Sequence, residues 1–162
     1  MSVIRPAAVA GSFYPATAQE LGTTLQKLLH KAASNLDTDT LSNVPKAIVV
    51  PHAGYVYSGP MAARAYARLR PAKDIIKRVI LLGPCHRVAV KGLALSSAKA
   101  FATPLGNIEL DQDAIDQIKN LPQVSVFDQT HREEHSLEVH LPFLQIMLGK
   151  FKLIPLVVGD CD

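Results

Sequence analysis

The sequence has few cysteines and no long hydrophobic run. Cys85 and Cys161 are too few for a disulfide framework, and they do not form the CxxC spacing of a structural zinc site. The longest apolar runs, such as 79–82 and 153–158, have the length of a strand and are far too short to cross a bilayer. The N-terminus lacks the unbroken apolar segment of a secretory signal. Together these absences predict a cytoplasmic protein with no membrane partner.

Strong charge of one sign is also missing. The chain has 17 Lys and Arg residues against 14 Asp and Glu residues, and the basic residues are scattered, which excludes a nucleic-acid partner. Hydrophobic residues make up 48% of the 162 residues, enough for one domain with a sizeable core. We therefore expect a single domain over residues 1–162.

Short apolar runs alternate with amphipathic segments along the chain. Four runs are expected to form strands, the longer three buried on both faces: 47–50, 78–82, 93–95 and 153–158. Four segments are expected to form helices: 16–33, 61–69, 111–121 and 137–148. This alternation predicts a three-layer α/β fold, with helices on both faces of a mainly parallel sheet.

Two prolines and one acidic residue bear on where these helices begin. We expect 54–57 to be a loop, so that Pro60 lies in the first turn of the helix at 61–69, where its missing N–H has no cost. Asp111 is the expected N-cap of the third helix. Pro142 predicts a kink or a displaced start in the fourth.

Two histidines follow predicted strands. His52 comes directly after Pro51 at the end of the run 47–50, and His86 follows the Gly-Pro-Cys sequence at the end of 78–82. In open α/β sheets, ligands bind at the carboxyl ends of strands, and neighbouring strands are about 4.8 Å apart. The two imidazoles can therefore reach one point and form a partial ligand set for a first-row metal. Because a single histidine in such a place more often makes ordinary hydrogen bonds, only the pair predicts a metal.

The residues alone do not identify the third metal ligand or the role of His135. Asp160 and Cys161 follow the last predicted strand at the same edge, and either is a candidate for the third ligand. His135 precedes a predicted helix, where it either points into the site as an acid or base or belongs to a purely structural segment. In the structural alternative, which is slightly favoured, Ser136 caps the helix and Glu138 is exposed to solvent.

Residues next to the two histidines are candidates for substrate contacts. Tyr55 and Tyr57 follow His52 in the same predicted loop and are expected to line the mouth of a pocket. Arg87, beside His86, offers a bidentate contact to an anion. Cys85 is most simply a small packed side chain.

Several motifs resemble those of the Memo family, also called AmmeMemoRadiSam system protein B. They occur in one order along nearly the whole chain: RPA at 5–7, AGSFYP at 10–15, PHAGYVYSGP at 51–60, LGPCH at 82–86, TPLG at 103–106 and EHSLEVHLPF at 134–143. Because six motifs recur in order, the resemblance is more specific than any one of them.

The resemblance implies the fold of the class III extradiol ring-cleaving dioxygenases, with a non-haem metal at the strand ends. It implies that His52 and His86 are the amino-terminal metal ligands and that His135 lies near the site as a functional residue. Iron is the metal expected first, with copper or zinc as alternatives. Cys85 stands where the family commonly has Ser or Thr, so competition by its thiol for the metal stays an open alternative. Family members continue beyond the position of residue 162, and the remaining ligand is expected there.

Two main functional hypotheses follow from the resemblance and the site. The first is a metal-dependent redox protein of the dioxygenase type, in which His135 transfers a proton for a small-molecule substrate. The alternative is a non-enzymatic module that binds phosphorylated peptides through Tyr55, Tyr57 and Arg87. Metal-assisted hydrolysis would need a further carboxylate or histidine at the strand ends. An incomplete sheet would expose apolar surface and an unpaired edge, so self-association is also expected.

Overall fold

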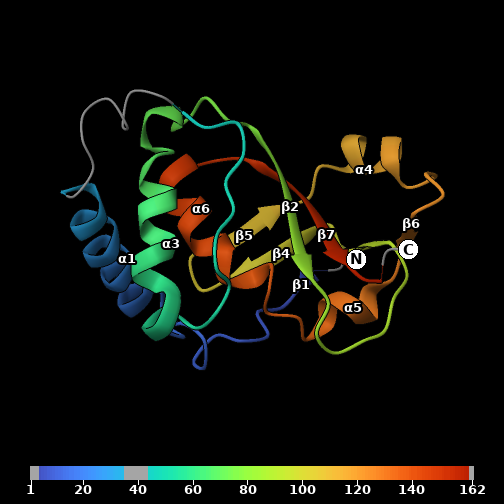
Figure 1. Ribbon diagram of the computed structural model, residues 1–162, viewed down its shortest axis with the longest axis horizontal. Helices are drawn as coiled ribbons and strands as arrows, with labels where there is room; N and C mark the ends of the chain where they lie inside the picture. Colours follow the sequence, from blue (N-terminus) through green and yellow to red (C-terminus); the bar gives the residue numbers. More distant parts are fainter. Residues whose placement is uncertain (1–3, 35–43, 161–162) are drawn as a thin grey trace.

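The computed structural model describes residues 4–34 and 44–160 (Figure 1). Within these ranges, every helix is too short or too polar to serve as a membrane span.

The strands of the described residues form two mixed sheets. The three-stranded sheet has the order β1 (Ile4–Arg5), β4 (Ala100–Thr103) and β5 (Gly106–Glu109). The four-stranded sheet has the order β2 (Arg78–Pro84), β7 (Lys152–Val158), β3 (Leu93–Leu95) and β6 (Val124–Val126). β2 and β7 pair in parallel over their full length, whereas β3 runs antiparallel to β7. A bridge between Leu110 and Leu153 links the chain after β5 to β7.

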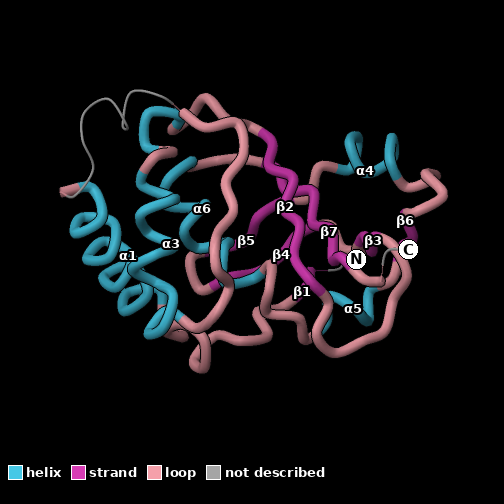
Figure 2. Tube along the Cα trace, in the orientation of Figure 1, coloured by secondary structure: helices cyan, strands magenta, loops and turns pink. Residues whose placement is uncertain are grey.

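Helices lie on both sides of these strands (Figures 1 and 2). Three helices pack together at the left of the view: α1 (Ala18–Ala33), α3 (Tyr55–Ala67) and α6 (Leu141–Leu148). The remaining helical elements are shorter: η1 (Arg70–Ala72), α4 (Gln112–Ile118), α5 (Asp128–Arg132) and η2 (Glu138–His140). The side chain of Thr17 caps α1, and Leu21, Leu25 and Leu29 of this helix are buried in the core. The predicted α/β fold is confirmed.

Most of the predicted elements are present with small changes at their ends. The strands at 78–82, 93–95 and 153–158 correspond to β2, β3 and β7. Asp111 caps α4 by accepting a hydrogen bond from the Ala114 N–H. Pro142 lies in the first turn of α6, so the displaced start is confirmed; the preceding residues form the separate 3-10 turn η2.

The predicted strand at 47–50 is wrong. These residues belong to no strand. They are part of the segment that leads from Val44 to the start of α3. The side chains alternate: Ile48 and Val50 pack against the core, while that of Val49 is fully exposed. A continuous apolar run predicted burial on both faces, but only one face of this extended segment is covered.

The start of α3 is also different from the prediction. The helix begins at Tyr55 because the Gly54 carbonyl accepts hydrogen bonds from the Tyr57 and Ser58 N–H groups, which closes a first turn. Pro60 is therefore the sixth helical residue rather than a member of the first turn. Burial of Tyr55 in the core favours this earlier start over a loop.

One face of β2 is left open to solvent. Ile80 and Leu82 are 64% and 54% exposed, and Val49 is exposed as well. Exposed apolar surface of this kind is the physical basis of the self-association expected from the sequence, which stays a prediction.

Candidate metal centre

Three histidine side chains from separate parts of the chain meet at one point. His52 precedes α3, His86 follows β2, and His135 lies between α5 and η2. The ring centroids are 5.3 Å apart for His52 and His86, 5.7 Å for His52 and His135, and 4.4 Å for His86 and His135. One nitrogen from each ring lies within 4.8 Å of the others. The meeting of His52 and His86, expected from the sequence, is therefore present, and His135 joins them.

Close backbone approach at the end of β2 places His86. Gly83 is buried there, and a Cβ atom on it would lie 2.8 Å from the Ser136 Oγ. The Ser136 hydroxyl donates a hydrogen bond of 2.8 Å to the Pro84 carbonyl. The segment that carries His135 is thereby fastened to the strand end that carries His86.

Contacts with the N-terminal segment place His52 and His135. The Tyr55 N–H donates to the Phe13 carbonyl at 2.8 Å, which holds the start of α3 and the nearby His52. The Phe13 ring packs against His135 with a centroid distance of 4.6 Å. Phe13 therefore forms an apolar wall beside the cluster.

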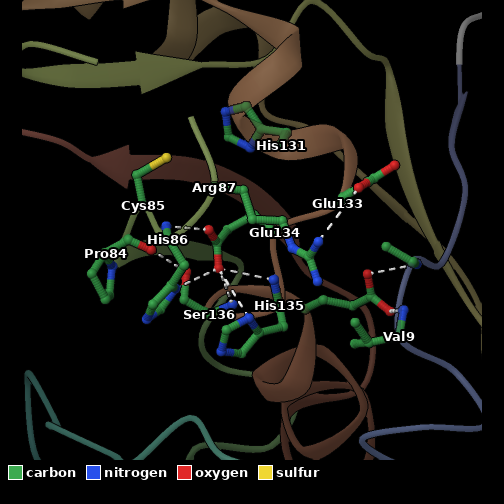
Figure 3. Close-up of polar contacts among 12 residues, drawn as sticks. Val9, Pro84, Cys85, His86, Arg87, His131, Glu133, Glu134, His135 and Ser136 are labelled. Atoms are coloured by element: carbon green, nitrogen blue, oxygen red, sulfur yellow. Dashed lines mark hydrogen bonds and ion pairs between the residues drawn. The ribbon is translucent and has the colours of Figure 1, made fainter. Parts of the chain in front are cut away.

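The buried carboxylate of Glu134 organises the site (Figure 3). Its Oε2 accepts the His86 N–H at 2.7 Å, and its Oε1 accepts the backbone N–H groups of His135 and Ser136 at 2.9 Å. Oε1 also lies 2.9 Å from the His86 Nδ1. With a proton on Nδ1, this contact fixes the ring and leaves Nε2 as the free lone pair, an arrangement common among metal-ligating histidines. No sequence pattern predicted this role of Glu134, whose one local signal is its position directly before His135.

The electrostatics of the cluster favour neutral imidazoles and an ionised carboxylate. Burial lowers the pKa of His52, and the nearby His86 lowers it further. Burial also lowers the pKa of His135, although the Glu134 charge opposes this. Burial by itself would raise the pKa of Glu134, but hydrogen bonds from Ser136 and His86 bring it below its ordinary value. Metal binding requires deprotonated imidazole nitrogens, so these shifts suit a metal site.

The donor set fits a first-row transition metal. Imidazole nitrogen bonds such ions at about 2.0–2.1 Å, so two ligands of one ion are at most about 4.2 Å apart. Nitrogens within 4.8 Å of one another need only small side-chain movements to meet that limit. Imidazole ligands suit iron, copper and zinc and do not choose between them.

The other ligand candidates are not in this cluster. Asp160 forms a backbone bridge with Lys91 and is not part of the group. Cys161 lies outside the described residues. The Cys85 thiol donates to the Val88 carbonyl at 2.8 Å and is likewise not part of the group.

Glu138 is buried, which corrects the expectation of a solvent-exposed side chain. Its carboxylate is ion-paired with Arg5 and accepts hydrogen bonds from the Ala8 and Val9 N–H groups at 2.8 and 3.0 Å. The Tyr14 hydroxyl donates a further bond of 2.5 Å. Ser136 does not cap a helix, because its hydroxyl is bonded to Pro84. In the sequence, Glu138 is a single charge between the apolar residues Leu137 and Val139. A charge in such a run can be buried when it is paired, and this was the signal for its burial.

The three predicted substrate-binding residues differ in exposure. Tyr55 is buried, and its hydroxyl donates to the Val139 carbonyl at 2.8 Å. Tyr57 is 86% exposed. Arg87 is exposed next to His86, with its guanidinium 3.7 Å from the Glu133 carboxylate. Their roles in binding stay predictions.

Comparison with known proteins agrees with the motifs. The family described as Memo-like protein matches residues 5–162. A MEMO1 family protein of Aquifex aeolicus is 40% identical over 156 residues, covering 96% of this chain and 55% of that protein. Protein MEMO1 of Danio rerio is 36% identical over 165 residues, covering 97% of this chain and 52% of that protein. The chain thus spans about half the length of these curated relatives. Since the family match extends over nearly all of its residues, the chain belongs to the Memo family.

Proposed function

We propose that this protein holds a redox-active first-row metal, iron or copper, through His52 and His86 and acts on a small-molecule substrate. The observation that carries the proposal is the convergence of three imidazoles within 4.8 Å beside a buried carboxylate. The resemblance to the Memo family, which implies the fold of the class III extradiol dioxygenases, supports redox chemistry over hydrolysis. A bound metal of this kind supplies Lewis-acid and electron-transfer chemistry.

The chain's own residues orient a metal ligand, transfer a proton and contact the substrate. Glu134 holds His86 through Nδ1, so that its Nε2 is directed away from the carboxylate. His135 has a lowered pKa and is neutral near pH 7, so it can accept a proton from a substrate hydroxyl. Arg87 is exposed beside His86 and supplies a contact to an anionic group of the substrate, and the exposed Tyr57 side chain of α3 is assigned a second substrate contact.

Metal content and oxygen consumption test this function. The protein is reconstituted with iron(II) or copper, freed of loosely bound ion, and analysed for bound metal and for oxygen uptake with catechols. We expect stoichiometric metal in the unmodified protein and its loss in the His52→Ala/His86→Ala double variant. The His30→Ala variant removes an exposed imidazole from α1 and serves as the control. Equal metal content in all three proteins would contradict the proposal.

Two further variants separate binding from catalysis. The His135→Gln variant should retain the metal while its oxygen-uptake rate falls by roughly 10² to 10⁴, the usual contribution of a positioned acid or base. The Glu134→Gln variant should weaken metal affinity by about 10- to 100-fold, because it disturbs the partner of a ligating histidine. Binding of phosphorylated peptides that survives loss of His52 and His86 would instead favour the non-enzymatic binding module.

A further inference from the structure

A cavity lies at the opposite end of β2 from the histidines. It has a volume of about 490 Å³ and is formed by the amino-terminal ends of β2 and β7, by β5, and by the turn between α6 and β7. Its lining includes four cationic side chains: Lys77, Arg78, Lys150 and Lys152. β2 has seven residues, so at about 3.3 Å per residue the cavity lies roughly 20 Å from the end of the strand that carries His86.

The positive charge of this cavity is largely unneutralised. Among the described residues, no carboxylate lies within 4.0 Å of the ammonium groups of Lys77, Lys150 or Lys152. Arg78 uses its Nε to pair with the buried Asp111 at 2.6 Å, and its side chain is still 61% exposed. Glu109 is the one acidic residue in the described lining. The cavity therefore has a net positive charge and favours an anionic ligand.

The strand register places two of these cations side by side. Arg78 and Lys152 are direct partners in the parallel ladder between β2 and β7, and the Lys152 N–H donates to the Lys77 carbonyl at 2.9 Å. Like charges opposite each other in a sheet are destabilising. Asp111 offsets part of this repulsion through its pair with Arg78, and an anion bound between the two cations offsets the rest and gains charge-assisted hydrogen bonds.

The cavity also has apolar walls of suitable size. The buried side chains of Ile108 and Phe151 contribute to its lining. Gly149, at a φ of 72°, makes the turn after α6 that brings Lys150 and Phe151 to this position. Small-molecule sites typically have volumes of about 300–1,000 Å³ and combine apolar walls with a few polar groups.

We propose that this cavity binds a small phosphorylated molecule. The phosphate lies against Arg78, Lys150 and Lys152, and the organic part packs on Phe151 and Ile108. This site is independent of the metal function proposed above, since the two lie at opposite ends of β2.

Binding of phenyl phosphate and inorganic phosphate tests the site. Chemical shifts of the backbone amides are followed by NMR in phosphate-free buffer with EDTA during titration with each compound. We expect saturable shifts centred on residues 149–152, with phenyl phosphate dissociation constants between about 10 µM and 1 mM. Inorganic phosphate should bind more weakly because it lacks the ring. Equal affinity for the two compounds would overturn the assignment of an organic phosphate.

Matched lysine variants separate a specific site from general charge attraction. The Lys150→Gln/Lys152→Gln variant should weaken phenyl phosphate binding by at least about tenfold, because two charge-assisted contacts are lost. The Lys27→Gln/Lys46→Gln variant removes the same charge from exposed positions elsewhere and should bind normally. Thermal unfolding verifies that both variants fold. Absence of saturation, or equal weakening in both variants, would overturn the proposal.

Discussion

Acid should destabilise this protein through two buried histidines outside the metal cluster. His131 and His140 are 2% and 6% exposed, and burial lowers the pKa of each to about 4. The His131 Nε2 lies 2.9 Å from the Ala94 carbonyl, while the His140 ring packs near Tyr66 with a centroid distance of 6.0 Å. Both imidazoles are therefore neutral in the folded protein at neutral pH.

The magnitude follows from the difference between the folded and unfolded states. An exposed histidine in the unfolded chain takes up a proton near pH 6.5, but the folded protein resists protonation until about pH 4. The unfolded state therefore binds more protons in this interval, so stability is intact above pH 6.5 and is lost as the pH falls towards 4. Each histidine accounts for about 2 kcal/mol at pH 5 and roughly 3 kcal/mol below pH 4.

Urea denaturation between pH 7 and pH 5 in the presence of EDTA measures this loss. The unmodified protein should lose roughly 4 kcal/mol from these two residues, in addition to the contributions of His52 and His135, whose pKa values burial also lowers. His140→Phe keeps an aromatic ring but removes the titrating group, so its loss should be smaller by about 2 kcal/mol. His30→Phe, at an exposed position, should leave the loss unchanged. The reasoning is refuted if His140→Phe and the unmodified protein show the same dependence on pH.

Three other outcomes are expected. Glu138→Gln should lower the free energy of unfolding by about 3–5 kcal/mol, because it leaves the buried Arg5 without its charge partner. A decrease of less than about 1 kcal/mol in urea denaturation would contradict this. Gly83→Ala should destabilise by about 1–3 kcal/mol and weaken metal binding, since its Cβ meets the Ser136 Oγ at 2.8 Å. The control Gly22→Ala, with open space in α1, should be stabilising by roughly 0.5–1 kcal/mol, and equal effects at both glycines would disprove the steric argument. We expect the protein to self-associate in solution, as measured by light scattering, because its exposed apolar face favours contact with a second copy. A monodisperse monomer would contradict this prediction.

Much of the fold could be predicted because the signals are local. The leucine spacing of α1, the Asp111 cap of α4 and the apolar runs of β2 and β7 each depend on neighbouring residues only. The meeting of His52 with His86 was predicted on the premise that each histidine follows a strand, but this premise holds only for His86, which follows β2. His52 reaches the same point from a segment that is not a strand.

Long-range contacts decided the rest. Residues 47–50 have the composition of a buried strand, yet a strand also needs a paired neighbour, and no local pattern reports whether one is there. Glu138 is buried because Arg5, more than 130 positions away in sequence, supplies its charge partner. His135 reaches the cluster because Glu134 and Ser136 fasten its segment to the end of β2. The sequence by itself determined the four longest helices, three of the seven strands of the described residues and two of the three histidines. Tertiary packing decided which charges are buried and which third imidazole joins them, because those depend on distances between segments far apart in the chain.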